Sequence, residues 1–235
     1  MTSLEKIKVS KKILFFGGAG TSTESGIPDF RSSGGIYSIA PEEWLSSRYL
    51  YKHTDKFYDF YKSQMLYPNA KPNRGHEILS RWEKEGRLLG VITQNIDGLH
   101  QKAGSKNVVE LHGSVERNYC QTCSKTYSLE EVIEKEGTPR CDCGGLIRPD
   151  VVLYGEMLDD GVVSKAIDLL NQAELLIVAG SSLVVYPAAG MLQYFGGDDI
   201  IMINKGATSY DSRASLVLRN GFSQDMEYLD QIIRE

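Results

Sequence analysis

The chain has few cysteines and lacks a long hydrophobic run. Its 235 residues include only 4 cysteines, and all of them fall between positions 120 and 143. This confinement favours a metal site in a reducing compartment over a disulfide framework. No apolar stretch approaches the ~20 residues that a membrane-spanning helix needs, and the N-terminal residues do not resemble a signal peptide. We therefore expect a cytoplasmic protein without a membrane partner.

An excess of positive charge is also absent. The formal net charge is -5 at pH 7, which gives the chain no general affinity for nucleic acids or anionic membranes. We therefore do not expect direct nucleic-acid binding. The remaining composition is ordinary for a globular protein, and the chain is long enough to bury a large hydrophobic core.

Short apolar runs predict the strands of the fold. They cover residues 12–16, 88–93, 108–111, 175–180, 199–203 and 214–218. The runs are rich in Val, Ile and Leu with little alternation, as in a parallel sheet that is covered on both faces. We therefore predict an α/β fold with a Rossmann-like, doubly wound parallel sheet.

The spacing of these runs predicts two insertions. The gaps between the first and second runs and between the third and fourth are longer than one crossover helix requires. We assign residues 1–35, 86–114 and 148–235 to a discontinuous Rossmann-like domain, and residues 36–85 and 115–147 to a helical insertion and a zinc-ribbon insertion that together form a smaller domain. Helical patterns cover 41–50, 55–66, 73–85, 129–133, 160–173, 187–196 and 224–234.

A glycine-rich stretch, GGAGTSTESGIPDFR at 17–31, follows the first strand. Such a turn presents bare backbone N–H groups to a pyrophosphate. The spacing departs from the usual dinucleotide fingerprint, because the next glycine after Gly20 is Gly26. The segment also breaks at Pro28 instead of continuing into a helix. From these residues alone, a phosphate site and an ordinary glycine-rich loop are both possible.

Polar groups also follow the later strands. TQNIDGLH ends the second strand at 93–100, ELHGS ends the third at 110–114, GSS follows the fourth at 180–182, and Asn204-Lys205 ends the fifth. Ligands of open α/β sheets bind at this carboxyl edge. His112 is the best general-base candidate because its pKa lies near working pH, although a buried core histidine is the alternative. We expect His53 to be solvated and His76 to cap a helix or join the core.

The cysteine spacing, Cys120-x-x-Cys123 and Cys141-x-Cys143, is typical of two knuckles that close on one zinc ion. Four thiolates fill the coordination shell, so we predict a structural role. Unliganded or redox-active thiols are the alternative. A zinc-ribbon module that binds nucleic acid is disfavoured because Lys and Arg are sparse here relative to Glu.

Several of these motifs together resemble the sirtuins, the NAD-dependent protein lysine deacylases, and the bacterial type among them. Residues 18–31 fit the pattern GAG-x-S-x-x-x-G-I-P-D-F-R, residues 93–100 fit TQN-x-D-x-L-H, and His112 lies in the family's L-H-G context. The resemblance runs from about Phe15 to Lys205. Two departures are Gly17, where the family usually has Thr, and the second cysteine knuckle, which is one residue shorter than usual.

The resemblance implies a role for each matching residue. His112, Asn95 and Asp97 would be catalytic. Residues 148–156 resemble the loop that pairs with an extended acyl-lysine peptide, with Val151, Val152, Tyr154, Gly155 and Glu156 at the substrate, whereas His100 is expected to be structural. The residues expected to bind NAD are Gly18, Ala19, Gly20, Thr23, Asp29, Phe30, Arg31, Gln94, Asn95, Ile96, Asp97, His112, Gly180, Ser181, Ser182, Asn204, Lys205 and Phe222.

The implied activity is NAD-dependent protein lysine deacetylation. As the family implies, the acyl oxygen displaces nicotinamide from the ribose, His112 deprotonates a ribose hydroxyl that attacks the resulting imidate, and water completes the release of free lysine and O-acyl-ADP-ribose. A mono-ADP-ribosyltransferase that uses the same cavity is an alternative. A non-catalytic NAD sensor or zinc-ribbon interaction protein is another, and the presence of His112, Asn95 and Asp97 together argues against it.

The helix predicted at 55–66 bears on the acyl group. Sirtuins that prefer succinyl- or malonyl-lysine carry Tyr-x-x-Arg at the matching place, whereas this chain has Tyr58-x-x-Tyr61. A phenol brings no positive charge to a carboxylate. The two tyrosines either contact the acyl chain directly or belong to the core of the small domain. Both interpretations predict that a neutral acyl group, acetyl first, is preferred.

Overall fold

The main sheet contains the six predicted strands. A computed structural model describes residues 3–235 and places these strands in the order β3-β2-β1-β7-β8-β9, with every neighbouring pair parallel. Their bounds are β1 Ile13–Gly17, β2 Leu88–Thr93, β3 Val108–Glu110, β7 Leu175–Ala179, β8 Asp199–Ile203 and β9 Leu216–Leu218. The predicted parallel sheet is therefore confirmed.

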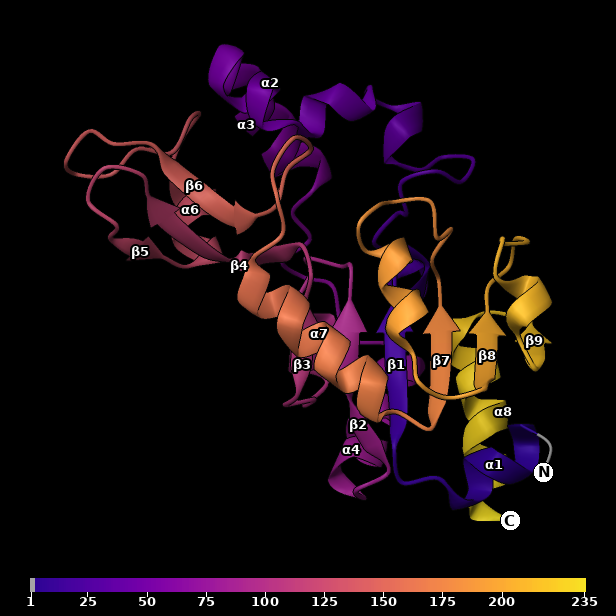
Figure 1. Cartoon of the computed structure of the whole chain (residues 1–235). Helices are drawn as coiled ribbons and strands as arrows, with labels where there is room; N and C mark the ends of the chain where they lie inside the picture. The colour runs from indigo at the N-terminus through magenta and orange to yellow at the C-terminus, as the bar shows by residue number, and fades with distance from the viewer. Residues whose placement is uncertain (1–2) are drawn as a thin grey trace.

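Helices cover both faces of this sheet, as Figure 1 shows. On one face lie α7 (Asp160–Gln172) and the 3-10 helix η5 (Ala189–Tyr194), and on the other lie α1 (Ser3–Val9), α4 (Arg74–Lys84) and α8 (Phe222–Arg234). Successive side chains of a strand point to opposite faces, so Leu14 and Phe16 join the first layer while Ile13 and Phe15 join the second. Both layers of helices therefore pack against one central sheet through buried apolar side chains.

Helix α4 packs against the main sheet. The sequence analysis instead placed its residues in the smaller domain. Ile78, Leu79 and Trp82 are fully buried in the same cluster as Phe15, and the Trp82 indole donates to Asp230 of α8 at 2.9 Å. Periodicity identifies the buried face of a helix but not the element that covers it. The proposed domain bounds remain a prediction, and α1 was not predicted at all.

The small lobe combines an antiparallel sheet with short helices. Its three strands lie in the order β5-β4-β6. The elements are β4 Gly113–Cys120, β5 Thr126–Tyr127, β6 Ile147–Val151, α2 Ser47–Lys52, α3 Thr54–Gln64, α6 Leu129–Glu134, and the 3-10 helices η3 Ile36–Ser38 and η4 Glu42–Leu45. Tyr58 and Tyr61 of α3 pack with Val115 and Leu129 in the core of this lobe.

The helix predicted over 41–50 is broken at Ser46. This residue has an extended backbone, with φ -98° and ψ 150°, and its side chain accepts a hydrogen bond from the Tyr49 N–H. Serine therefore ends η4 and caps α2, a competition between side chain and helix that periodicity does not reveal. The segment predicted as a helix over 187–196 forms the shorter 3-10 helix η5 instead.

The start of α4 confirms one histidine prediction. Asn73 accepts hydrogen bonds from the backbone of Gly75 and His76, while the His76 ring accepts from the Asn73 N–H, which makes a capping box. Just beyond the helix, Gly86 has φ +71°, the left-handed conformation that favours glycine where a helix ends.

The remaining short elements lie at the carboxyl edge of the sheet or in the last loops. They are η1 Ala19–Thr21, η2 Thr23–Ser25, α5 Leu99–Lys102 and η6 Asp211–Arg213. Among residues 3–235, no helix is both long enough and apolar enough to cross a membrane.

Candidate active site

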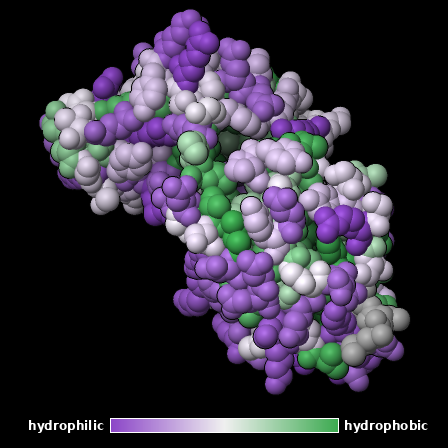
Figure 2. Space-filling model, viewed as in Figure 1, coloured by the Kyte–Doolittle hydropathy of each residue, from purple (hydrophilic) through white to green (hydrophobic). Residues whose placement is uncertain are grey.

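A cavity of about 720 Å³ lies between the carboxyl edge of the main sheet and the small lobe. Figure 2 shows the surface hollowed where the two parts meet, with hydrophobic residues along the neck between them. Every residue that the sequence proposed for catalysis, NAD or substrate lines this one cavity. Segments that are distant in sequence are thus brought together as the strand order requires.

The glycine-rich loop packs closely on the end of β7. The Gly18 N–H donates to the Ala179 carbonyl at 3.0 Å, and the Gly20 N–H donates to the Gly180 carbonyl at 2.8 Å. A Cβ atom on Gly20 would lie 2.7 Å from the Gly180 Cα. The prediction of bare amides is therefore wrong for these two N–H groups, because the close backbone approach uses them to hold the loop.

A hydrogen-bonded network joins this loop to the end of β2. The Asn95 amide donates to Thr21 Oγ1 at 3.1 Å and to Ser22 Oγ at 3.0 Å, and Ser22 Oγ donates to Asp97 Oδ2 at 2.7 Å. Burial raises the pKa of Asp97, while the Leu99 N–H and the Ser22 hydroxyl favour the carboxylate. Asn95 is only 8% exposed. The side chains of Asn95 and Asp97 are therefore held in fixed positions at the cavity wall.

His112 follows β3 and lies beside the end of β2. Its Nδ1 is 2.9 Å from the Gln94 carbonyl oxygen. A carbonyl oxygen only accepts, so Nδ1 carries the proton and Nε2 is left as an acceptor. Burial lowers the pKa of His112, and the Gln94 hydrogen bond opposes that shift. The neutral imidazole is thus the favoured form near neutral pH, as a general base requires.

The residue after His112 must be glycine. Gly113 has φ +76°, and a Cβ there would lie 1.9 Å from the Asp150 carbonyl oxygen of β6. This close contact brings the segment at 148–156 next to the histidine, and the Val152 N–H donates to the His112 carbonyl at 3.0 Å.

The Glu156 carboxylate organises the segment at 151–156. It accepts from the Arg148 guanidinium at 2.5 Å and from the Leu153 N–H at 2.9 Å. Tyr154 forms backbone hydrogen bonds with Leu45 and Ser47 of the small lobe. The segment is thus fixed from both sides while its residues line the cavity.

The opposite end of the cavity is lined by the ends of β7 and β8. The Gln94 amide donates to Ser181 Oγ at 2.9 Å, and the Asn204 amide donates to the Gly206 carbonyl at 2.9 Å. Phe222 also borders the cavity, but it is only 4% exposed and packs against Phe15 and His76. Its contacts are therefore chiefly those of a core residue.

The other histidines behave as the sequence predicted. His53 is exposed. His76 and His100 are buried with their ring centroids 4.6 Å apart, and His100 is 1% exposed. Burial lowers the pKa of His76 to about 4 and that of His100 well below its ordinary value. Both are neutral core residues outside the cavity lining.

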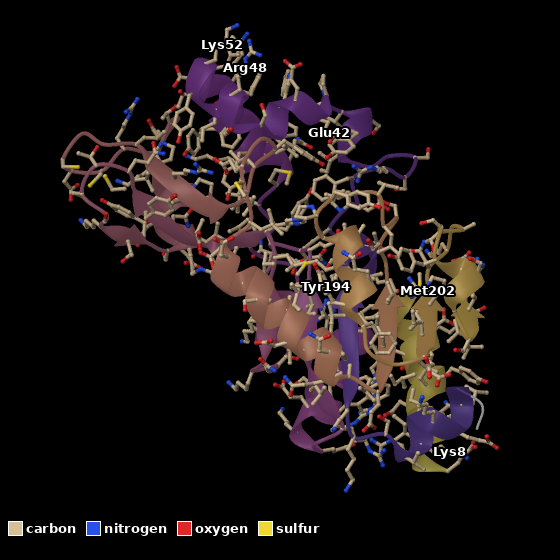
Figure 3. The ribbon with its side chains drawn as sticks, viewed as in Figure 1. Lys8, Glu42, Arg48, Lys52, Tyr194 and Met202 are labelled. Atoms are coloured by element: carbon tan, nitrogen blue, oxygen red, sulfur yellow. The ribbon has the colours of Figure 1, made fainter. Side chains whose placement is uncertain are left out.

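The two tyrosines of α3 lie outside the cavity lining. Both are buried, and the Tyr58 hydroxyl donates to the Ile147 carbonyl at 2.5 Å. Lys62 donates to the Lys135 and Gly137 carbonyls, and Figure 3 places Arg48 at the outer surface of the small lobe. The interpretation of Tyr58 and Tyr61 as core residues is therefore the one that the geometry favours.

Sequence reasoning missed the apolar wall of the cavity. Met65, Val115, Leu129 and Leu153 line it and also belong to the core of the small lobe. Nothing in their sequence distinguishes them from other core residues, because each lies on an ordinary apolar face. Only the three-dimensional arrangement shows that this part of the core is open to the cavity.

The four cysteines form a cluster apart from the cavity. Their Sγ atoms all lie within 4.8 Å of one another, with separations of 3.5 Å for Cys120 and Cys143, 3.6 Å for Cys123 and Cys141, and 3.5 Å for Cys143 and Cys123. Four sulfurs at about 2.3 Å from one zinc ion would lie about 3.8 Å apart. The shorter second knuckle therefore still supplies both of its thiols, and the cluster fits one zinc ion.

Comparisons with known proteins agree with this geometry. The Sir2 family profile matches residues 18–187. A Clostridium acetobutylicum protein named NAD-dependent protein deacetylase is 50% identical over 242 residues, covering 97% of this chain and 99% of that protein. A protein of the same name from Cutibacterium acnes is 46% identical over 233 residues, covering 97% of this chain and 96% of that protein.

Solved structures are similar over nearly the whole chain. A Sir2 structure with a deacetylated p53 peptide and 3′-O-acetyl ADP ribose matches with a TM-score of 0.90 and 41% identity, covering 97% of this chain and 96% of that one. A Sir2 homologue in complex with ADP ribose matches with a TM-score of 0.91 and 37% identity, covering 98% of this chain and 95% of that one. The chain therefore belongs to the Sir2 family, the sirtuins.

Proposed function

We propose that this sirtuin is an NAD-dependent protein lysine deacetylase that releases nicotinamide, free lysine and O-acyl-ADP-ribose. The observation that carries the proposal is the position of His112. Its Nδ1 is hydrogen-bonded to Gln94, it lines the same cavity as Asn95 and Asp97, and its backbone pairs with Val152 of the substrate segment. The names of its bacterial relatives support the same activity.

The residues around the cavity fit NAD as the second substrate. A side chain on Gly18 or Gly20 would collide with the Gly180 backbone. The loop therefore presents only backbone atoms where a pyrophosphate would approach. We assign Gln94, Asn95, Ile96 and Asp97 to the nicotinamide-ribose end, and Ser181, Ser182, Asn204 and Lys205 to the adenosine end. When bound, NAD supplies an activated ribosyl carbon that accepts the acyl oxygen.

The protein's own contribution is orientation and one proton transfer. Asn95 and Asp97 are fixed by Thr21 and Ser22, and that rigidity is what positions a reacting group. His112 Nε2 is the acceptor that takes a hydroxyl proton, and such general-base help contributes roughly 10²- to 10⁴-fold to a rate. The apolar wall excludes water around these groups.

The zinc site takes no part in these steps. Four thiolates complete a tetrahedral shell and leave no position for a substrate or an activated water. We assign the ion to the fold of residues 120–143.

The division into a Rossmann-like domain of 1–35, 86–114 and 148–235 and a small domain of 36–85 and 115–147 is part of the proposal, amended by the packing of α4 on the sheet. The cytoplasmic location also remains a prediction.

Incubation of the protein with an acetyl-lysine peptide, with and without NAD, tests the proposal. We expect the peptide mass to fall by one acetyl group only when NAD is present. A peptide that instead gains ADP-ribose would replace the proposal with the mono-ADP-ribosyltransferase alternative. A peptide that is unchanged with NAD present would contradict both activities.

A further inference from the structure

A second hollow lies on the outer face of the small lobe. Its volume is about 380 Å³, and its lining consists of Glu43, Ser46, Arg48, Tyr49, Lys52 and His53. Arg48 and Lys52 lie four positions apart on α2, so they share one face of the helix. Figure 3 shows both side chains at the outer edge of the small lobe, away from the main sheet. The proposed chemistry does not account for this basic hollow.

The basic groups of the hollow have no acidic partner. Among residues 3–235, no acidic side chain forms an ion pair with Arg48, Lys52 or His53, and all three are exposed. Glu43 lines the hollow without pairing to them, and Glu42 lies 3.9 Å from Arg31 instead. Two full positive charges therefore face solvent at one place on a chain whose net charge is -5.

The hollow is continuous with the segment assigned to the peptide. Ser46 lines the hollow, and its neighbour Leu45 lines the cavity. Ser46 also forms a β-bridge with Tyr154, and the Ser47 N–H donates to the Tyr154 carbonyl at 3.1 Å. An extended chain advances about 3.3 Å per residue. A peptide that leaves the cavity past Tyr154 therefore reaches the hollow within a few residues.

Local charge decides what such a peptide meets there. The net charge of -5 repels anions at long range, but salt screens that field beyond about 8 Å. Close to α2, the two cations dominate. Like charges four positions apart on a helix repel each other, and a carboxylate placed between them relieves that repulsion. The hollow is thus suited to acidic side chains and not to basic ones.

We propose that Arg48 and Lys52 form a secondary binding surface for acidic residues of the protein substrate, a few positions from the acyl-lysine. The inference rests on the proposed function, because it places the acyl-lysine peptide in the cavity. The surface selects among substrate sites by the charge of the flanking sequence. Because it touches neither NAD nor the reacting groups, it acts on peptide binding and on KM while kcat is kept.

Peptides that differ only in flanking charge test this surface. Fluorescent acetyl-lysine peptides of one neutral core carry glutamates before the acetyl-lysine, glutamates after it, or glutamines at both places. Anisotropy titrations without NAD measure Kd, and steady-state rates at saturating NAD measure kcat and KM. The wild type is compared with the double variant Arg48→Gln/Lys52→Gln, which removes both cations from the hollow.

Lys8→Gln/Lys165→Gln is the matched control, because it changes the net charge by the same amount. Both lysines are exposed and lie outside the lining of the cavity and of the hollow. Figure 3 places Lys8 at the opposite end of the molecule from Arg48 and Lys52. The contact of Lys8 with Glu235, at 4.0 Å between exposed side chains, contributes little to the fold.

We expect the wild type and the control to bind one of the two glutamate peptides roughly 2- to 30-fold more tightly than the glutamine peptide, the range of two exposed ion pairs. The preference belongs to one side of the lysine because the hollow lies at one end of the segment. In Arg48→Gln/Lys52→Gln it should fall close to one, with Kd and kcat for the glutamine peptide within about twofold of the wild type. Raising the salt from about 50 mM to about 500 mM should remove the wild-type preference.

Equal wild-type affinity for all the peptides would overturn the inference, and so would a preference that survives in Arg48→Gln/Lys52→Gln or is lost equally in the control. Equal tightening by glutamates on both sides of the lysine would show an attraction unrelated to this hollow. Deacetylation of the glutamine peptide is measured separately. Turnover without a charge preference would contradict the inference and leave the proposed function intact, whereas a preference in binding without turnover would support the surface and contradict the proposed function.

Discussion

At the scale of single residues, the proposed function assigns the proton transfer to His112. The Gln94 carbonyl sets its tautomer, and burial keeps the imidazole neutral. Its position follows from elementary constraints: β3 ends at Glu110, Leu111 is buried, and Gly113 allows β6 to approach. Several weak features of the sequence thus combine to place His112 at the cavity.

We expect His112→Ala to lower kcat by at least about 100-fold, because the general base is lost. The fold should remain, since His112 lies at the cavity edge and its removal empties space that is already open. Turnover and thermal unfolding are measured together, with His53→Ala as an exposed control. Near-normal turnover would reject the assignment, and loss of the folded state would make His112 a structural residue.

The polar part of the site could be predicted because the end of each apolar run in the sequence marks the end of a strand. Gln94, Asn95, Gly180, Ser181 and Asn204 each follow an apolar run, and parallel strands bring such positions to one edge. The apolar wall could not be predicted in this way. Met65 and Leu129 look like core residues, and only tertiary packing turns one side of them toward a cavity.

At the scale of elements, strands were easier to predict than the packing of helices. Continuous apolar runs identify buried parallel strands directly. Ser46 interrupts a helical pattern through its own side chain, and the partner of α4 depends on which of two apolar surfaces it meets. Neither fact is encoded in the periodicity of the segment concerned.

The segment that carries the four-cysteine cluster should unfold separately from the main sheet. Chelation of zinc is expected to unfold residues near 120–143 before the sheet, because metal binding supplies folding free energy to this segment. Hydrogen exchange resolved along the chain measures the order of unfolding. Activity should fall only as this segment unfolds.

Cys143→Ser provides a matched test of the zinc assignment, because it exchanges one sulfur for oxygen in an exposed side chain. Metal analysis should show substoichiometric zinc in this variant and one zinc ion in the reduced wild type. Wild-type protein without stoichiometric zinc, or a variant that loses zinc without any change in exchange near 120–143, would count against the structural role.

The buried histidines make stability depend on pH. The pKa of His76 falls from an ordinary 6.5 to about 4 in the fold, so the unfolded chain binds more protons between these values. The contribution of neutral, buried His76 to stability is therefore fully present above pH 6.5 and is lost as the pH falls toward 4. The slope is at most about 1.4 kcal/mol per pH unit for one histidine.

His76→Gln should reduce this dependence. Glutamine also suits the third position of a capping box, so the start of α4 is retained while the titrating ring is removed. Between about pH 7 and about pH 5, the wild type should lose up to ~2 kcal/mol more unfolding free energy than the variant. Denaturant titrations at both pH values measure this difference. Equal losses in the two proteins would show that His76 does not contribute to the pH dependence of stability.

At the scale of the whole molecule, the cavity exists because two separate parts of the fold meet. The sheet contributes polar strand ends and the small lobe contributes an apolar wall, while residues 151–156 also line the cavity. The glycines at 18, 20, 113 and 180 make backbones approach closely enough for these parts to join. The overall arrangement accordingly follows from the parallel sheet and its two insertions.

The positions of the tyrosine, lysine and arginine side chains in the small lobe predict a preference for a neutral acyl group. Tyr58 and Tyr61 lie in its core, Lys62 binds backbone carbonyls, and Arg48 lies at the outer surface. A succinyl carboxylate would therefore be buried without a guanidinium partner, which costs roughly 1.5 to 3 kcal/mol.

We expect kcat/KM for an acetyl peptide to exceed that for the succinyl peptide of identical sequence by at least about 10-fold, the lower end of that energy range. Steady-state rates with both peptides at saturating NAD measure the ratio. An equal or higher value for the succinyl peptide would mean that a cation reaches the acyl carboxylate.

The central claim is that the cavity transfers an acyl group from lysine to the ribose of NAD. The most direct measurement follows a peptide whose acetyl group carries an isotopic label and quantifies every product. The account predicts one nicotinamide and one labelled O-acetyl-ADP-ribose for each lysine released. Labelled free acetate formed without consumption of NAD, or ADP-ribose attached to the peptide, would contradict it.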